Sequence, residues 1–141
     1  MFRLYSKGCE YTIRALTFIS LNSPNERFSP KDICQKAKIP ESYTRKIFQS
    51  LVREGLFNAV TGPGGGYKLT KKPKDISILS IIKAIDGENT FNRCIMGLDD
   101  CDDKAPCPIH HSWKKIKHHL QEELKNKNLE QLIDIKERLE I

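Results

Sequence analysis

Apolar residues near the start of the chain recur every three or four positions, the spacing of one face of an α-helix. Cys9, Ile13 and Leu16 belong to this pattern, and Ser6 supplies a hydroxyl that can cap the first turn. The pattern stops at Asn22. We therefore expect a first helix that ends at Asn22, with Cys9 as a small core residue.

Two further helices follow closely. Ser29–Asp32 combines a capping hydroxyl, a proline in the first turn and an early acid, which together mark a helix start. This second helix, with Cys34 in its apolar pattern, must end before Pro40, because the residue before a proline disfavours helical geometry. A third helix runs from about Glu41 to Gly55, since glycine readily takes the left-handed conformation that ends a helix.

A helix, a tight turn and another helix form the helix-turn-helix layout, whose second helix enters the DNA major groove. In the third predicted helix Tyr43, Ile47 and Leu51 form the stripe expected to be buried. The polar residues expected to face outward near its start are Ser42, Thr44, Arg45, Lys46 and Gln49. Arginine and glutamine suit guanine and adenine edges, whereas the other three suit phosphates. An ordinary solvated helix face is the alternative.

A β-hairpin is predicted after the third helix. Leu56–Val60 and Tyr67–Thr70 have the composition of two short strands, and a turn with four glycines and one proline joins them. Gly64 and Gly65 would let the backbone approach DNA closely, and Lys68 adds positive charge. The turn lacks the Lys-Ser or Lys-Thr ending of a P-loop, so nucleotide binding is not expected. The hairpin has the features of a wing.

The second half of the chain is predicted to be helical on both sides of one irregular segment. Ser77 can cap a fourth, apolar helix that Gly87 ends. A charged helix from about Ile109 carries a narrow apolar seam, formed by Trp113, Ile116, Leu120 and Leu124. This seam suits pairing with a second copy of the chain, and packing on its own domain is the alternative. A last helix capped by Asn128 is expected on the same arm, with Leu129, Leu132, Ile133 and Leu139 as its apolar residues.

These elements predict a mainly α chain with a small β-hairpin. We expect a winged helix-turn-helix domain over residues 1–87, a cysteine-rich cluster-binding loop over residues 88–108, and a dimerisation helix with a C-terminal helix over residues 109–141. A chain of 141 residues is too short for two independent cores of ordinary size.

Positive charge is concentrated in the first half of the chain. Residues 1–75 hold 14 Lys and Arg against 6 Asp and Glu, a balance of +8, whereas residues 76–141 have a balance of −2. A compact basic region favours a polyanionic partner such as nucleic acid. No apolar run is long enough for a membrane span, and Lys7, Glu10 and Arg14 interrupt any signal sequence. We therefore expect a cytoplasmic protein without a membrane partner.

Three of the five cysteines fall together in the irregular segment. Cys94, Cys101 and Cys107 are spaced too widely for the short Cys-x-x-Cys unit of a zinc finger, but such a loop can surround a larger cluster. His110 lies three residues after Cys107 and is a plausible fourth ligand. Four aspartates flank Cys101, and their charge opposes a free thiolate, which favours a metal centre over a simple thiol switch.

Several motifs together resemble one family of regulators. The matching stretches are Tyr5–Lys7, Ile39–Tyr43, Gly62–Leu69 and Ile85–Gly87. The chain is similar to the winged-helix transcription regulators that include the iron-sulfur regulator IscR and the nitric-oxide-sensing repressor NsrR. The resemblance extends over nearly the whole chain, and its glycine-rich wing is the most specific part.

The resemblance implies a homodimeric regulator, and not an enzyme, that binds a near-palindromic operator in double-stranded DNA. It implies repression governed by redox state, nitric oxide or iron-sulfur status, through a cluster held by Cys94, Cys101 and Cys107. His110 matches a histidine ligand of the family, and Glu10 falls where other members use a carboxylate of the partner subunit. The ligand choice and the cluster type, 2Fe-2S or 4Fe-4S, stay open. A regulator that uses zinc or a thiol switch, and a small electron carrier, are the alternatives.

Overall fold

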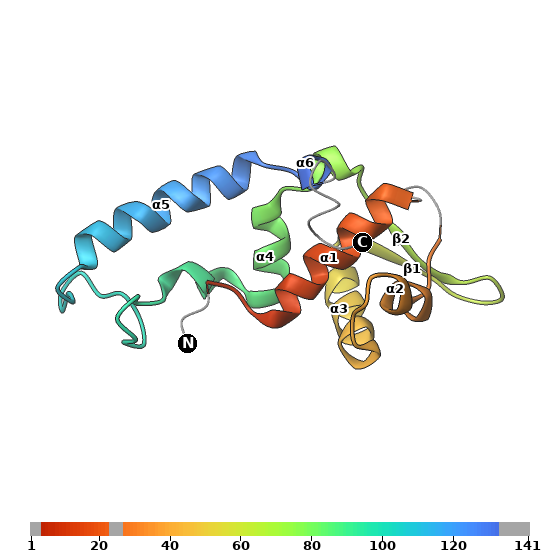
Figure 1. The fold of residues 1–141 in the computed structure, drawn as a ribbon, viewed down its shortest axis with the longest axis horizontal. Coiled ribbons are helices and arrows are strands. Elements are labelled where there is room, and N and C mark those ends of the chain that lie inside the picture. The colour runs from red at the N-terminus through yellow and green to blue at the C-terminus, as the bar shows by residue number, and fades with distance from the viewer. Residues whose placement is uncertain (1–3, 23–26, 133–141) are drawn as a thin grey trace.

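Helices dominate the computed structural model, which describes residues 4–22 and 27–132 (Figure 1). Within these ranges the longer elements are α1 (Lys7–Asn22), α2 (Pro30–Lys36), α3 (Glu41–Arg53), β1 (Phe57–Val60), β2 (Gly66–Leu69), α4 (Ile78–Asp86), α5 (His110–Asn126) and α6 (Leu129–Leu132). Two 3-10 turns, η1 (Pro73–Asp75) and η2 (Glu88–Asn92), flank α4. The mainly α fold with a small β-hairpin is as predicted.

Helix starts follow the predicted caps. The Ser29 hydroxyl accepts a hydrogen bond from the Asp32 N–H at 3.2 Å, and the Ser77 hydroxyl accepts one from the Ser80 N–H at 3.1 Å. Ser6 accepts one from the Cys9 N–H at 3.1 Å and also donates its own backbone N–H to the Asp86 carboxylate at 2.7 Å. Ser6 therefore caps α1 and ties the start of that helix to the end of α4.

Aromatic side chains form the centre of the main core. The Phe48 ring on α3 lies 5.0 Å from Phe57, 5.2 Å from Tyr67 and 5.7 Å from Phe28, measured between ring centroids. Edge-to-face contacts of this kind add to the stabilisation from burial. The core therefore fixes α3 against the hairpin, and Cys34 is buried beside it as expected.

The buried face of α3 differs by one position from the predicted stripe. Thr44, Ile47, Phe48 and Leu51 are buried, whereas Tyr43 is 45% exposed and packs edge-on against Tyr11. The prediction that Thr44 faces outward is therefore wrong. Its hydroxyl donates to the Pro40 carbonyl at 3.1 Å, so a threonine fits the buried side of the first turn without an unpaired polar group.

The hairpin is antiparallel, with Phe57 opposite Leu69 and Val60 opposite Gly66. Phe28 adds an isolated bridge to it, because the backbone N–H groups of Phe28 and Tyr67 donate to each other's carbonyls at 3.0 and 2.8 Å. Gly66 has a φ of +152°, and a Cβ there would stand 2.5 Å from the Phe28 carbonyl oxygen. Only glycine fits at this contact.

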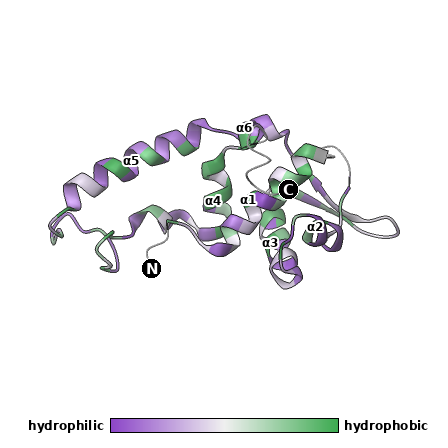
Figure 2. Cartoon of the chain, viewed as in Figure 1, coloured by the Kyte–Doolittle hydropathy of each residue, from purple (hydrophilic) through white to green (hydrophobic). Residues whose placement is uncertain are grey.

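The C-terminal helices turn back toward the first half of the chain. From the cysteine loop, α5 runs toward the start of α4, and α6 lies close to that point (Figure 1). Figure 2 shows α4 as mainly hydrophobic and α5 as mainly hydrophilic. Leu129 is fully buried in the main core, so the prediction that α6 packs on the α5 arm is wrong for this residue. Ile133 and Leu139 lie outside the described residues.

Part of the predicted seam of α5 packs within its own chain. Leu120 and Leu124 pack against a second cluster formed by Cys9, Ile82 and Phe91, and Trp113 is buried. Ile116 is 55% exposed. None of the helices among the described residues has the length and apolar character needed to cross a bilayer.

Candidate DNA-binding face and cysteine loop

The outer face of α3 carries the polar residues that were predicted to meet DNA, apart from Thr44. Ser42, Arg45, Lys46 and Gln49 are all exposed. The Arg45 side chain is 69% exposed, and its guanidinium pairs with Glu41 one turn earlier at 3.2 Å. Such an exposed pair is weak, about 0–1 kcal/mol, so the guanidinium can exchange it for a base edge or a phosphate at little cost.

The hairpin carries an exposed glycine in its turn and an exposed lysine on β2. Gly64 and Lys68 are exposed, and Gly65 is half-buried, with its N–H donating to the Gly62 carbonyl at 2.9 Å. Sequence analysis did not identify Arg27, whose guanidinium donates to the Gly64 carbonyl at 3.1 Å. The two residues are 37 positions apart in the sequence. No local pattern could have revealed this contact.

Cys94 and Cys107 lie together on the segment between η2 and α5. Cys94 is buried, and burial raises its pKa. Hydrogen bonds from the backbone N–H groups of Met96 and Leu98 and from the Cys107 thiol act in the opposite direction and prevail, so the pKa of Cys94 is lowered. The backbone of this loop therefore favours a thiolate at Cys94.

Cys101 is held separately from that pair, by α5. The Lys117 ammonium donates to the Cys101 sulfur at 3.0 Å, and the Cys101 backbone N–H donates to the Asn92 carbonyl at 2.8 Å. Lys117 is only 7% exposed, and its ammonium lies 5.9 Å from the centre of the Trp113 ring. This lysine was not identified from the sequence, because it lies 16 residues from Cys101 on a helix rich in lysine.

His110 begins α5 and is 2% exposed. Its Nε2 lies 2.7 Å from the Asp103 carboxylate, which also accepts from the Lys114 ammonium at 3.1 Å. The hydrogen bond to His110, and then that to Lys114, hold the pKa of Asp103 below its usual range. One of the acidic residues that flank Cys101, Asp103, is therefore paired with two side chains of α5.

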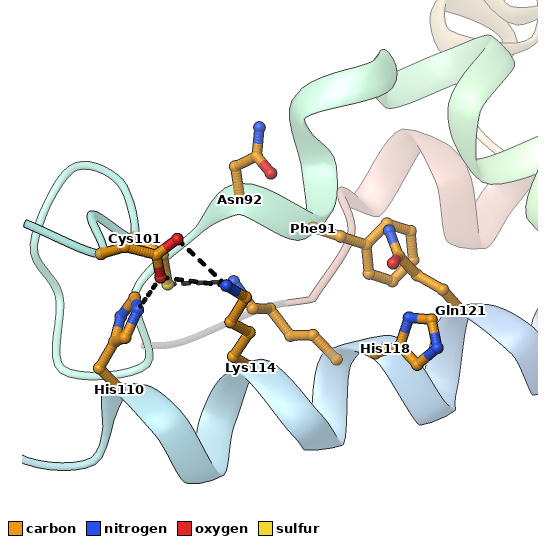
Figure 3. A pocket seen from close by; sticks show the side chains of 9 residues that line it. Phe91, Asn92, Cys101, His110, Lys114, His118 and Gln121 are labelled. Atoms are coloured by element: carbon orange, nitrogen blue, oxygen red, sulfur yellow. Dashed lines mark hydrogen bonds and ion pairs between the residues drawn. The ribbon is translucent and has the colours of Figure 1, made fainter. Parts of the chain in front are cut away.

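A cavity of about 310 Å³ lies between the loop and α5 (Figure 3). Cys101 from the loop and His110, Lys114 and His118 from α5 are among the side chains that line it. Cys94 and Cys107 do not line this cavity. The two sides of the loop therefore offer different surroundings to its thiols.

The predicted ligands do not form one preassembled set. Cys94 pairs with Cys107, Cys101 with Lys117, and His110 with Asp103, while Glu10 on α1 pairs with Lys7 at 3.0 Å. Within residues 4–22 and 27–132, no three His, Cys, Asp or Glu side chains converge as a metal site would require. The donor chemistry of three thiols and an imidazole on one segment nevertheless fits an iron-sulfur cluster.

A helix-turn-helix with an exposed polar face, joined to a glycine-rich hairpin, defines the protein as a winged-helix DNA-binding regulator. A family model described as Rrf2, iron-dependent transcriptional regulator, matches residues 5–135. The chain belongs to the Rrf2 family.

Two relatives agree with this assignment. The HTH-type transcriptional regulator IscR of Escherichia coli O1:K1 is 33% identical over 139 residues, which cover 99% of this chain and 85% of IscR. IscR of Pectobacterium carotovorum is 32% identical over 139 residues, with 99% of this chain and 84% of the relative covered. These relatives are regulators of transcription, so the chain is a regulator and not an enzyme.

Solved structures share the fold. CymR, the global cysteine regulator of B. subtilis, superposes with a TM-score of 0.74 at 24% identity, covering 96% of this chain and 98% of CymR. T. potens IscR superposes with a TM-score of 0.71 at 23% identity, covering 96% and 90%. At this level of identity the structures establish the winged-helix fold and do not establish the chemistry of the cysteine loop.

Proposed function

We propose that the chain is a homodimeric cytoplasmic repressor that reads a near-palindromic operator with α3 and the wing. In this proposal it binds an iron-sulfur cluster on the loop of Cys94, Cys101 and Cys107 and responds to redox state, nitric oxide or iron-sulfur status. The proposal rests on the position of the cysteine loop in the fold. The three cysteines lie on the segment that connects the winged-helix core to α5.

The packing of this segment supports a link between the loop and the DNA-binding face. Phe91, three residues before Cys94, packs against Cys9 of α1 and Ile82 of α4. At the same end of the loop, the Trp113 indole N–H of α5 donates to the Arg93 carbonyl at 2.8 Å. Because the start of the loop is fixed in this way to α1, α4 and α5, a change in the loop's conformation would shift those helices.

Cys94, Cys101 and Cys107 would hold the cluster, with His110 or Glu10 of the partner subunit as the fourth ligand. The cluster would supply a centre that changes its charge or comes apart when it meets an oxidant or nitric oxide. To bind it, Cys101 must leave Lys117, and His110 must leave Asp103 if it is the ligand. Both contacts are partly buried hydrogen bonds, and a change in the loop would have to exchange them for ligation.

The cluster is tested by cysteine replacement in protein purified without oxygen. Cys94→Ala, Cys101→Ala and Cys107→Ala should each abolish visible absorption and bound iron. Cys9→Ala and Cys34→Ala remove thiols from the helical core and should retain both. Between His110→Ala and Glu10→Ala, the variant with the altered spectrum identifies the fourth ligand. Colourless protein with one zinc per chain would contradict the cluster.

Operator reading is tested by comparing Arg45 with Lys72, an exposed lysine beyond the hairpin. Arg45→Ala should cost about 1–3 kcal/mol at one position of the operator and relax the preference there, because a base contact carries sequence information. Lys72→Ala should weaken binding to all sequences alike and lower the salt dependence, as loss of a phosphate contact does. Fluorescence anisotropy against operator and random duplexes measures both. Equal losses on both duplexes for Arg45→Ala would show that Arg45 reads no base.

A dithiol switch is the second candidate, because a hydrogen bond with the Cys107 thiol is among the interactions that lower the pKa of Cys94. Reaction with a peroxide would join the two sulfurs in a disulfide, passing two electrons and two protons to the peroxide and releasing water. Peroxide treatment of metal-free protein followed by peptide mapping would detect that bond. Cys101→Ala distinguishes the candidates, since it should keep the disulfide and lose the cluster.

A further inference from the structure

A buried lysine on α5, Lys117, contacts the sulfur of one of the three loop cysteines. Lys117 is 7% exposed, although lysine is almost never buried without a partner. Its ammonium donates to the Cys101 sulfur at 3.0 Å and lies over the Trp113 ring. The neighbouring Lys115 on the same helix is exposed. The burial of Lys117 is therefore a specific feature of the face of α5 that meets the loop.

The Lys117 contact belongs to surroundings of Cys101 that differ from those of the other two thiols. Cys94 hydrogen-bonds with Cys107, whereas Cys101 faces the cavity lined by α5 (Figure 3). The Cys101 thiol also donates to the Arg93 carbonyl at 3.5 Å, and its backbone N–H donates to Asn92. Lys117 adds a charge-assisted contact to these two, and such contacts are stronger than neutral ones.

We propose that Lys117 is a positioning residue that sets how readily the loop takes up metal. In the metal-free chain it holds Cys101 against α5 and away from the Cys94–Cys107 pair. Three thiols can converge on one centre only after this contact is released. The inference rests on the proposed cluster function and adds to it a restraint that raises the iron concentration needed for loading.

The test compares Lys117→Met, which keeps the length of the side chain and removes its charge, with Lys115→Met as the matched exposed control. Lys117→Arg keeps the charge and should behave like the parent. With anaerobic reconstitution at limiting iron and sulfide, Lys117→Met should reach half of its final visible absorption at about tenfold lower iron, because loss of one charge-assisted contact changes an equilibrium by about that factor. Lys115→Met should match the parent.

A second measurement needs no metal. Hydrogen–deuterium exchange of the metal-free protein should show faster exchange at the Cys101 amide in Lys117→Met than in the parent and Lys115→Met, because the loop loses its restraint. If Lys117→Met does not fold, Lys117→Gln takes its place in both measurements.

The results separate this inference from the proposed function. If the parent binds no iron, the cluster proposal fails, and Lys117 loses its role in loading whatever the exchange shows. If the parent binds iron but Lys117→Met loads at the same or higher iron concentration, or leaves exchange at Cys101 unchanged, the positioning role is overturned while the cluster stands.

Discussion

At the scale of single residues, Cys9 shows how burial sets the behaviour of a thiol outside the loop. It lies on α1 and is fully buried in the cluster that it forms with Ile82 and Phe91. Burial, and then the charges of Asp86 and Glu10, raise the pKa of Cys9 from 9.0 to about 12. Cys9 therefore stays a protonated thiol, whereas the surroundings of Cys94 in the loop favour a thiolate.

The raised pKa of Cys9 predicts an alkaline loss of stability. Between pH 9.0 and about 12 the unfolded chain ionises this thiol and the folded chain does not, so the free energy of unfolding falls as pH rises through that window. Cys9→Ala should reduce this fall and leave the part due to Tyr5, whose pKa burial also raises. Urea unfolding at a series of pH values measures it.

Ile82→Val provides the control for that experiment, because it removes a methyl group from the same cluster and keeps the thiol. It should cost about 0.5–1.5 kcal/mol at every pH and retain the alkaline fall of the parent. An alkaline fall that is the same in Cys9→Ala and the parent would show that Cys9 does not remain protonated.

At the scale of elements, local signals were enough to predict most helix starts and ends, and they were not enough for contacts between distant segments. Ser29 and Ser77 cap their helices because a hydroxyl needs only the next three residues to do so. The orientation of α3 depends on the aromatic core, so Thr44 was placed on the wrong side. Contacts such as Lys117 with Cys101 join residues far apart in the sequence, and no single-sequence pattern encodes them.

The wing supplies a prediction at this scale. Gly66→Ala should destabilise the protein by about 2 kcal/mol or more, because the new Cβ meets the Phe28 carbonyl and the bridge between Phe28 and Tyr67 must open. Gly62→Ala is the matched variant in the same turn. Its φ is +87° with no atom within 4 Å of the added Cβ, so it should cost about 1–2 kcal/mol from the left-handed conformation alone.

Thermal unfolding and DNA affinity check the wing together. Gly66→Ala should lower operator affinity more than Gly62→Ala does, since it displaces β2 and with it Lys68. Equal melting temperatures and equal affinities for the two variants would show that the Phe28 contact does not fix the wing.

At the scale of the whole molecule, the exposed side of α5 bears on assembly. Trp113, Leu120 and Leu124 pack within the chain, at least in part, whereas Ile116 is 55% exposed and Ile109 is 41% exposed. The predicted dimer seam is thus divided between the chain's own core and the surface. Pairing of two copies through α5 stays a prediction, and it would use Ile116 and the remaining exposed edges of the half-buried leucines.

Ile116→Glu tests this pairing. A charge at the centre of an apolar interface should weaken dimerisation at least tenfold, because a buried unpaired carboxylate is costly. Analytical ultracentrifugation measures the association, and circular dichroism should show the helices intact. Lys115→Glu, at an exposed position of the same helix about 100° around its axis from Ile116, is the control and should leave the dimer unchanged. A dimer of parent strength in Ile116→Glu would place the interface elsewhere.

Because α6 returns to the main core, the segment from α4 to α6 closes on itself and forms a ring. The Leu129 N–H donates to the Ile76 carbonyl at 2.9 Å, and the Ile78 N–H donates to the Lys127 carbonyl at 3.0 Å, so both ends of the segment from α4 to α5 meet at one point. Because these bonds fix both ends of the segment, one part of it cannot shorten without a change in another part. If uptake of the proposed cluster changes the conformation of the cysteine loop, we expect the angle between α5 and α4 to change, because the far end of α5 is fixed at this point. In the proposed function, the ring would then turn a local change among thiols into a rotation of the helix proposed to join two copies of the chain.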